Sequence, residues 1–543
     1  MKMKSDLTRA PDLAAKRGTG PTRSQRPVYV DLLPPCNAAC PAGENIQAWL
    51  ALAQAGQHRE AWLQILDDNP LPAVHGRVCY HPCEKSCNRA QLDETVSIHS
   101  VERFLGDRAL DEGWTPDVAA PSDKRVLIVG AGPSGLSAAY HLARFGHAVE
   151  IRDAGAQAGG MMHFGIPAYR LPRDVLDAEV ERIRGMGITI TLNHRVENLE
   201  QEWSEGHFDA VFAAVGAHLS KRVDIPATDA VRMLDALSYL RDVDRGAPPK
   251  LGRRIAIYGG GNTAMDAART ALRLGHEPLI VYRRDYAHMP ALPFEADEAM
   301  EEGVKIHWLR SIAAVTGSTM QVEIMEIGTD GKACGTGTYE TLEADAVVLA
   351  VGQDADTRFI VGMPGVVLQR DGTVEVDQRM MTGRPGLFAG GDMVPAERSV
   401  TVAVGHGKKA ARHIDAWLKS GTYEKTPVRG DATFDKLRLW FTRDVAQRAQ
   451  ERMPLAARRE SFGEVVQGLS ADEAVFEAKR CLSCGNCFEC DACFGACPED
   501  AITKLGTGLR YRFEYDRCTG CAICFEQCPC HAIEMQPEPA AAT

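Results

Sequence analysis

The sequence predicts an α/β protein in which two Rossmann-like domains are flanked by cysteine-rich regions. Two observations support this prediction. A short apolar strand, a glycine loop and a helix follow one another at residues 126–145 and again at residues 254–274. In addition, each of the 17 cysteines except Cys334 lies in a cluster near one end of the 543-residue chain. A chain of this length is enough for about three or four domains.

The first glycine loop has the pattern of a dinucleotide site. Gly130, Gly132 and Gly135 follow the strand at residues 126–129, and the next strand ends on Asp153. Such a loop lets a pyrophosphate approach the backbone at a helix N-terminus, where free N–H groups favour anions. Asp153 is spaced to accept hydrogen bonds from an adenosine ribose. A glycine turn without a ligand is the alternative.

The second loop differs from the first in how it ends. The strand at 254–258 leads into the loop GGGNTA at 259–264, and the following strand at 278–282 ends in Arg283 and Arg284 instead of an acid. A carboxylate there would bind the 2′-hydroxyl of NAD, whereas guanidinium groups suit a 2′-phosphate. The pattern therefore favours NADP(H). A solvated surface pair of arginines is the alternative.

The first nucleotide domain continues beyond the second one. Residues 209–217 and 345–352 each have the pattern of a strand followed by a small turn, residues 387–392 that of a strand followed by two glycines and an acid, and residues 401–418 that of a helix. We therefore expect the second domain to be inserted in the first.

The C-terminal cysteines form a duplicated run typical of bacterial ferredoxins, C-x2-C-x2-C-x3-C-P. In such a run the fourth cysteine binds the cluster of the other run. We therefore expect two [4Fe–4S] clusters, and zinc is a weak alternative. One has the ligands Cys487, Cys490, Cys493 and Cys528, and the other has Cys518, Cys521, Cys524 and Cys497.

The N-terminal cysteines are Cys36, Cys40, Cys79, Cys83 and Cys87, each group spaced by x3. Zinc sites usually use C-x2-C, so iron–sulfur is the better interpretation and zinc the alternative. Residues 46–66 have helical spacing, and residues 100–110 predict a helix that carries Glu102.

Composition excludes several classes of partner. The net charge of −12 argues against nucleic acid and against an anionic membrane surface. No apolar run reaches the roughly 18 residues that a membrane span needs. The N-terminal residues 1–27 are basic and polar, and we expect a flexible arm and a cytoplasmic protein whose thiols bind metal and form no disulfides.

Several strings carry a resemblance to a known family. They are GRVC at 76–79 with Cys83 and Cys87, GM at 160–161, GIP at 165–167, GGGNTAMD at 259–266, YRR at 282–284 and GGD at 390–392. In these strings the chain resembles the glutamate synthase small-subunit family of FAD- and NAD(P)-dependent oxidoreductases, with an appended C-terminal ferredoxin domain.

The resemblance implies that the first nucleotide is FAD and the second NADP(H). It implies that FAD is bound by Gly130, Gly132, Pro133, Ser134, Gly135, Asp153, Gly160, Met161, Gly165, Val196, Gly216, Gly391, Asp392 and Thr401. It implies that NADP(H) is bound by Gly261, Asn262, Thr263, Ala264, Arg283 and Arg284. It also implies an N-terminal cluster with the ligands Cys40, Cys79, Cys83 and Glu102.

The expected domains follow from these assignments. Residues 1–120 hold the arm and a helical iron–sulfur domain, and residues 121–235 the first part of the FAD domain. Residues 236–360 are the NADP domain, and residues 361–420 complete the FAD domain. A helical connector at 421–480 leads to a ferredoxin-like domain at 481–543.

The chain departs from the family at one point. The family has a C-x2-C pair before the position of Cys36, and this chain has none there, which leaves Cys36 and Cys87 as half of a site. Cys481 and Cys484 are surplus at the other end and resemble the missing pair. We hypothesise that they fold back, in the same or a partner chain, to complete the site. The alternative is that all four are spare thiols.

The expected function is electron transfer between NADPH and a low-potential protein partner through FAD and [4Fe–4S] clusters. A flavin converts hydride, a pair of electrons, into the single electrons that clusters carry. No catalytic acid, base or nucleophile is expected. By analogy, the partner is a catalytic subunit in a hetero-oligomer, such as a ferredoxin-type 2-oxoacid oxidoreductase or a reductase of aromatic thioesters. The alternatives are the small subunit of NADPH-dependent glutamate synthase and a non-catalytic iron–sulfur scaffold.

Overall fold

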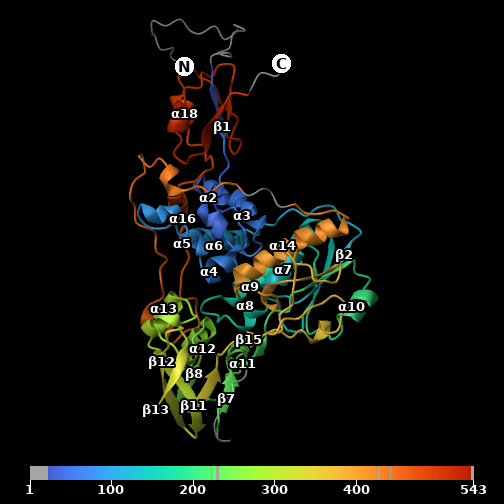
Figure 1. The fold of residues 1–543 in the computed structure, drawn as a ribbon, viewed down its shortest axis with the longest axis vertical. Helices are drawn as coiled ribbons and strands as arrows, with labels where there is room; N and C mark the ends of the chain where they lie inside the picture. The colour runs from blue at the N-terminus through green and yellow to red at the C-terminus, as the bar shows by residue number, and fades with distance from the viewer. Residues whose placement is uncertain (1–22, 222, 228–231, 425–428, 441, 540–543) are drawn as a thin grey trace.

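The computed structural model describes residues 23–221, 223–227, 232–424, 429–440 and 442–539. The molecule is elongated, with the cysteine-rich C-terminal region at one tip and a sheet domain at the other (Figure 1). The N-terminal helices lie between the C-terminal tip and the first sheet domain, so the two cysteine-rich regions are neighbours in space.

The first nucleotide domain is built on a parallel sheet of five strands. Its buried core strands Val126–Val129 and Ala210–Ala213 are apolar throughout, as parallel strands covered on both faces require. The helices α7 (Pro133–Arg144) and α14 (Val400–Leu418) pack against each other beside this sheet. In spatial order the strands are β16 (Leu387–Ala389), β5 (Ala210–Ala213), β2 (Arg125–Val129), β3 (Ala148–Arg152) and β4 (Thr189–Thr191).

The second sheet lies entirely between β5 and β16 in the sequence. Its five parallel strands are β10 (Lys305–Trp308), β9 (Glu277–Tyr282), β8 (Arg254–Tyr258), β14 (Ala346–Leu349) and β7 (Arg232–Asp235). The helices of this domain are α11 (Ala236–Asp244), α12 (Asn262–Arg273) and α13 (Pro293–Glu302). Strands β6 (Leu219–Ser220) and β15 (Gln353–Asp354) pair where the chain enters and leaves this part.

An antiparallel sheet of three strands extends the second domain: β11 (Arg310–Thr316), β12 (Thr319–Ile327) and β13 (Ala333–Glu343). No element of this sheet is predicted from the sequence. Shorter helices complete the first domain, namely α8 (Met161–Phe164), α9 (Arg173–Arg184) and α10 (Leu199–Glu205).

The N-terminal region is helical around a core that includes Trp49, Ile65 and Leu105. The predicted helical run at 46–66 is two helices, because Gly56 takes φ +76° between them. The helices are α1 (Pro35–Ala39), α2 (Ile46–Gln54), α3 (His58–Leu66), α4 (Pro72–Val78), α5 (Pro82–Lys85) and α6 (Ile98–Asp111).

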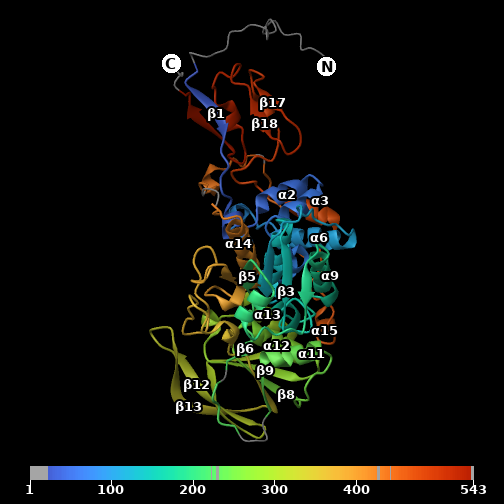
Figure 2. The same ribbon diagram turned by 90° about the vertical axis from the view of Figure 1, so that its right-hand side faces the viewer.

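The C-terminal region contains short elements around two groups of cysteines. They are α17 (Ala492–Ala496), β17 (Ile502–Lys504), β18 (Tyr511–Phe513), α18 (Ile523–Glu526) and β19 (Ile533–Pro537). Strand β1 (Gln25–Tyr29) pairs antiparallel with β19, from Gln25 opposite Pro537 to Tyr29 opposite Ile533 (Figure 2). The expected flexible arm is therefore wrong for residues 25–27, and residues 1–22 lie outside the described residues.

The expected helical connector at 421–480 is also wrong for most of its length. Its described part contains only α15 (Leu455–Arg458), α16 (Ala471–Lys479) and a single 3-10 turn at Phe434–Lys436. The backbone N–H groups of Val445, Gln447 and Arg448 donate to carboxylates of Asp93, Glu94 and Glu477. Those donors are thus satisfied by side-chain carboxylates and form no helical ladder. Within the described ranges, no helix is both long and apolar enough to cross a bilayer.

Candidate redox site

The first glycine loop has room for a ligand at one residue and none at two others. A Cβ atom on Gly130 would lie 2.3 Å from the carbonyl oxygen of Ala214, and one on Gly135 would lie 1.9 Å from that of Gly130. Gly130 also takes φ +110°. Open space faces Gly132 at the start of α7, where the helix presents its free N–H groups. This cradle fits a pyrophosphate.

Most of the residues expected to bind FAD line one continuous hollow. It consists of a cavity of about 180 Å³ and a neighbouring one of about 430 Å³ that share Gly130, Asp153 and Gly160. Of the expected residues, the larger one also includes Val196. The smaller one also includes Gly132, Pro133, Ser134, Met161, Gly165, Gly216, Gly391 and Asp392.

Two carboxylates, those of Asp153 and Asp392, line this hollow. Asp153 accepts hydrogen bonds from the backbone N–H groups of Ala131 and Gly155, both at 2.6 Å, and so ties the glycine loop to the return segment. Burial raises the pKa of Asp392, and the nearby Arg398 opposes that rise. A carboxyl with a raised pKa can donate a hydrogen bond to a ligand more readily than an exposed one.

Two expected FAD residues lie outside the hollow. Gly135 packs α7 against the end of β2, as its short distance to Gly130 indicates. Thr401, at the start of α14, donates its hydroxyl to the sulfur of Cys79 at 3.2 Å. Its neighbour Val400 lines the cavity, so this turn lies between the cavity and the N-terminal cysteines.

The second glycine loop opens into the same 180 Å³ cavity through Asn262 and Thr263. The amide of Asn262 donates to the hydroxyl of Tyr80 at 2.7 Å, which joins this loop to the N-terminal region. Open space faces Gly261, whereas Ala264 is fully buried inside α12. Two dinucleotides bound at the two loops would therefore meet in one cavity.

Arg283 and Arg284 follow the end of β9, away from this cavity. Arg283 is exposed and Arg284 is half-buried. The Nε atom of Arg284 is buried and has no hydrogen-bond partner among the described residues. An unsatisfied buried donor on a cation fits an anionic group such as a 2′-phosphate.

The structure brings Cys40, Cys79 and Cys83 together with the carboxylate of Glu102. Burial and then Glu102 raise the pKa of Cys79 to about 12, and the pKa of Cys83 is raised by burial and by Glu84, Cys79 and Cys40. Such thiols stay protonated unless a metal centre stabilises the thiolates.

Glu44 is an additional carboxylate at this site that the sequence analysis missed. It acts electrostatically on Cys40, Cys79 and Cys83, as Glu102 does on the first two. The amide of Asn69 donates to Glu44 at 3.1 Å and to Glu102 at 2.7 Å. The only signal in the sequence was the position of Glu44, four residues after Cys40.

The two cysteine runs of the C-terminal region interleave in space. Burial and then Cys487, Cys528 and Cys490 raise the pKa of Cys493 to about 12. The other group, Cys497, Cys518, Cys521 and Cys524, lines a cavity of about 20 Å³. Cys530, which the sequence analysis left unassigned, lies 3.8 Å from Cys528, and its hydrogen bond lowers the pKa of Cys528 to about 7.

The comparisons with known proteins agree with this geometry. The family model for pyridine nucleotide-disulphide oxidoreductases matches residues 124–407, which include both glycine loops. The chain belongs to this family. A second model, dihydropyrimidine dehydrogenase domain II with a 4Fe-4S cluster, matches residues 23–114 of this oxidoreductase.

Three relatives of this oxidoreductase cover most of its length. The NADP(+)-dependent formate dehydrogenase subunit beta of Moorella thermoacetica is 37% identical over 498 residues, which are 83% of this chain and 70% of the relative. The NADPH-Fe(3+) oxidoreductase subunit beta of Geobacter sulfurreducens is 32% identical over 506 residues, 83% of this chain and 75% of the relative. The glutamate synthase [NADPH] small chain of Escherichia coli is 33% identical over 419 residues, 71% of this chain and 89% of the relative.

These findings confirm the predicted fold class, the resemblance to the glutamate synthase small subunit and the prediction of an NADPH-dependent FAD and iron–sulfur oxidoreductase. The hollow at the first loop, the open second loop and the grouped cysteines fit these cofactors.

Proposed function

We propose that this chain carries electrons between NADPH and a low-potential protein partner, as the NADP-reactive subunit of a larger complex in the cytoplasm. One observation carries the proposal. Val78 and Tyr80, the two neighbours of Cys79, line the cavity into which both glycine loops open. A two-electron site and a one-electron site would thus share a boundary. FAD, when bound, accepts a hydride and releases its electrons singly.

The side chains have binding and positioning roles in this proposal. The loop at Gly130 and Gly132 binds the pyrophosphate of FAD, and Asp153 its adenosine ribose. Asn262 and Thr263 hold the nicotinamide end of NADPH beside the flavin ring, and Arg283 and Arg284 hold its 2′-phosphate. No side chain acts as an acid, base or nucleophile, because hydride and electron transfer need none.

The cluster assignments are part of the same proposal. Cys40, Cys79, Cys83 and Glu102 bind the cluster next to the flavin, and the two interleaved C-terminal groups bind two more. The domain limits are kept from the sequence, with two corrections: the second domain begins with β7 at Arg232, and residues 421–480 are a mostly irregular connector. The arrangement of the domains supports an electron path from the cavity through the N-terminal helices to the C-terminal tip (Figure 1).

The partner is proposed as a catalytic subunit that delivers or takes up electrons at low potential. Two of the relatives are subunits of a formate dehydrogenase and of an Fe(3+) oxidoreductase. The candidate partners are therefore a formate-oxidising subunit, a 2-oxoacid oxidoreductase and a reductase of aromatic thioesters. Co-purification from native cells identifies the partner.

The direct test is anaerobic reduction of the purified protein by NADPH. We expect the flavin absorbance to bleach first and the broad cluster absorbance to follow. A flavin that stays oxidised in the presence of NADPH contradicts the proposal, and it would favour the scaffold alternative.

The cofactor preference is tested by the double substitution Arg283→Gln with Arg284→Gln. We expect the KM for NADPH to rise roughly tenfold or more, since a hydrogen bond to a charged group contributes about 1.5–3 kcal/mol. The KM for NADH should change little. Arg253→Gln is the matched control, because Arg253 is an exposed arginine of the same domain that pairs with Glu277. An equal rise for both nucleotides refutes the assignment.

A second candidate is the small subunit of an NADPH-dependent glutamate synthase. The 33% identity to the Escherichia coli small chain favours it. Formation of glutamate after mixing with a glutamate synthase large subunit supports this candidate, and its absence with an intact flavin response favours the first proposal.

A further inference from the structure

Four cysteines from the two ends of the chain line one small cavity. Cys36 lies at the start of α1, Cys87 follows α5, and Cys481 and Cys484 follow α16. The two ends of the chain are in direct contact at this cavity. The amide of Asn88 donates to the sulfur of Cys484 at 3.4 Å, although the two residues are 396 positions apart in the sequence. The same chain therefore supplies both halves of the cavity.

The four thiols are close enough to act on one another. Burial raises the pKa of Cys36, and Cys481, Cys87 and Cys484 raise it further, in that order. Cys484 is buried and the other three cysteines are partly buried, and as thiolates the four would repel one another. A cation or a metal cluster removes that repulsion.

The cavity matches the site expected to bind a ferredoxin cluster. Its volume is about 20 Å³, the same as that of the cavity at Cys497, Cys518, Cys521 and Cys524. Apolar side chains surround it, including Leu50, Val96 and Ile98. Backbone or amide N–H groups donate to the sulfurs of Cys481 and Cys484, each at 3.4 Å. Hydrogen bonds to ligand sulfurs and low solvent exposure are features that tune iron–sulfur clusters.

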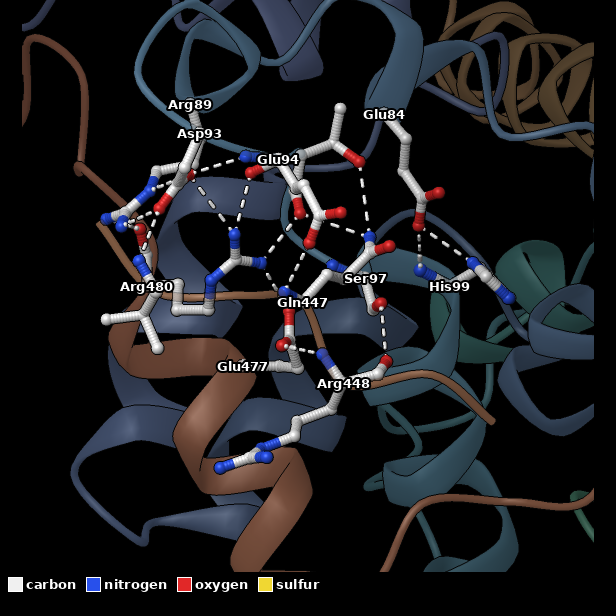
Figure 3. Close-up of polar contacts among 12 residues, drawn as sticks. Glu84, Arg89, Asp93, Glu94, Ser97, His99, Gln447, Arg448, Glu477 and Arg480 are labelled. Carbon is white, nitrogen blue, oxygen red and sulfur yellow. Dashed lines mark hydrogen bonds and ion pairs between the residues drawn. The ribbon is translucent and has the colours of Figure 1, made fainter. Parts of the chain in front are cut away.

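Ion pairs clamp the segment before Cys481 onto the segment after Cys87 (Figure 3). Arg480, only 3% exposed, donates to Asp93 at 3.2 Å and to Glu477 at 2.9 Å. Arg89 pairs with the same Asp93 and donates to the carbonyl oxygen of Arg480. Buried charges of this kind persist only when every one is paired.

The fully buried Glu477 completes the clamp. It accepts hydrogen bonds from the backbone N–H groups of Ser97 at 3.0 Å and Arg448 at 2.6 Å. The clamp therefore holds three segments, around residues 93, 448 and 480, in one arrangement. It fixes the position of the C-x2-C pair relative to Cys36 and Cys87.

We propose that Cys36, Cys87, Cys481 and Cys484 bind a further [4Fe–4S] cluster, with ligands drawn from both ends of one chain. Its position lets it pass electrons between the proposed flavin-side cluster and the C-terminal domain. Cys36 lies four residues before Cys40, and Cys87 four residues after Cys83, so it adjoins the proposed flavin-side cluster. Cys484 lies three residues before Cys487, the first ligand of the C-terminal domain. Electrons would pass through this cluster on the way to the ferredoxin-like tip.

The test is the iron, acid-labile sulfide and zinc content of the anaerobically purified full chain. With four iron atoms per cluster, we expect about sixteen irons and sulfides per chain for four clusters, and about twelve for three. Cys481→Ser with Cys484→Ser should remove about four irons and four sulfides. Cys334→Ser is the control, because Cys334 is exposed and distant from the clusters, and its iron content should equal that of the wild type.

Three results overturn the proposal: about twelve irons in the wild type, an unchanged iron content in the double variant, or the loss of one zinc with iron unchanged. The FAD content shows whether the double variant folds. If it does not, the wild-type count and Cys36→Ser, which alters the other end of the chain, decide the question. Bleaching of the flavin by NADPH tests the proposed function separately, so failure of one does not imply failure of the other.

Discussion

The two cysteine-rich ends build their sites in different ways. At the C-terminal end, both groups of four cysteines come from residues 487–528, and the spacing alone indicates which belong together. At the N-terminal end, the proposed sites combine residues 36–102 with residues 481–484. A site made from one run of residues depends on local spacing, whereas a site made from distant segments depends on the whole fold. The three predictions below test how far this difference holds.

The largest effect is expected for Glu477→Ala. Removing this carboxylate breaks its buried pair with Arg480 and leaves the backbone N–H groups of Ser97 and Arg448 without their acceptor, and breaking a buried pair costs about 3–5 kcal/mol. We expect the free energy of unfolding to fall by that amount and the iron bound near Cys36 to be lost, while the C-terminal clusters stay. Chemical denaturation and iron analysis measure the two effects.

Glu473→Gln provides the control on the same helix. Glu473 is a half-buried residue of the capping box with Ser470, and its change should cost about 1 kcal/mol or less. If both variants lose the same stability and the same iron, the clamp is not what holds the distant segments together.

A smaller effect is expected for Arg23→Ala, which tests whether the C-terminal domain also depends on a residue distant in the sequence. Arg23 pairs with Glu538 at 2.7 Å and donates to the backbone carbonyls of Tyr515 and Cys518. Its loss should destabilise the C-terminal domain by roughly 1.5–3 kcal/mol, since these bonds involve a charged donor. Faster removal of iron by a chelator is the measurement.

The exposed Arg517 of the same domain is the control, and Arg517→Ala should change stability by no more than about 0.5 kcal/mol. Equal chelation rates for Arg23→Ala and the wild type would mean that the C-terminal domain holds its clusters without help from the N-terminal strand.

The smallest effect is a pH dependence of the clamp. The hydrogen bond from Arg89 lowers the pKa of Asp93 below its ordinary value. A carboxyl whose pKa is lower in the folded than in the unfolded state stabilises the fold above the unfolded pKa, about 3.9, and this contribution is lost as the pH falls below it. Asp93→Asn should therefore destabilise the protein at pH 7 and matter progressively less below pH 4. A difference from wild type that is constant with pH contradicts this expectation.

Local patterns made most of the nucleotide region predictable. The strand at Arg254–Tyr258 has the limits that the sequence predicts, and α14 begins within one residue of the predicted start. Glycine is required at positions 130 and 135 because a Cβ atom there would clash with a backbone carbonyl oxygen, as the motif predicts. Each of these features depends on residues close together in the sequence.

Features that depend on distant residues were not predictable in the same way. The connector is not helical around residue 447 because carboxylates accept its backbone N–H groups, and two of these, Asp93 and Glu94, lie more than 350 residues away in the sequence. Glu44 was recognised as a carboxylate of the proposed flavin-side site only because the fold places it where its charge acts on Cys79 as well as on Cys40. From the sequence, four cysteines could either form one site or be spare thiols. The fold places all four, Cys36, Cys87, Cys481 and Cys484, in one cavity.

The pairing of β1 with β19 makes the polypeptide nearly a closed ring, because residue 25 ends up beside residue 537. During synthesis, β1 cannot pair until the residues of β19, about 500 positions later, have emerged. A short peptide joining the segment after β19 to the segment before β1, with new termini opened in the irregular connector, would place both cysteine-rich regions in one uninterrupted stretch of sequence. The order of these regions in the sequence and their order along the proposed electron path are thus independent of each other.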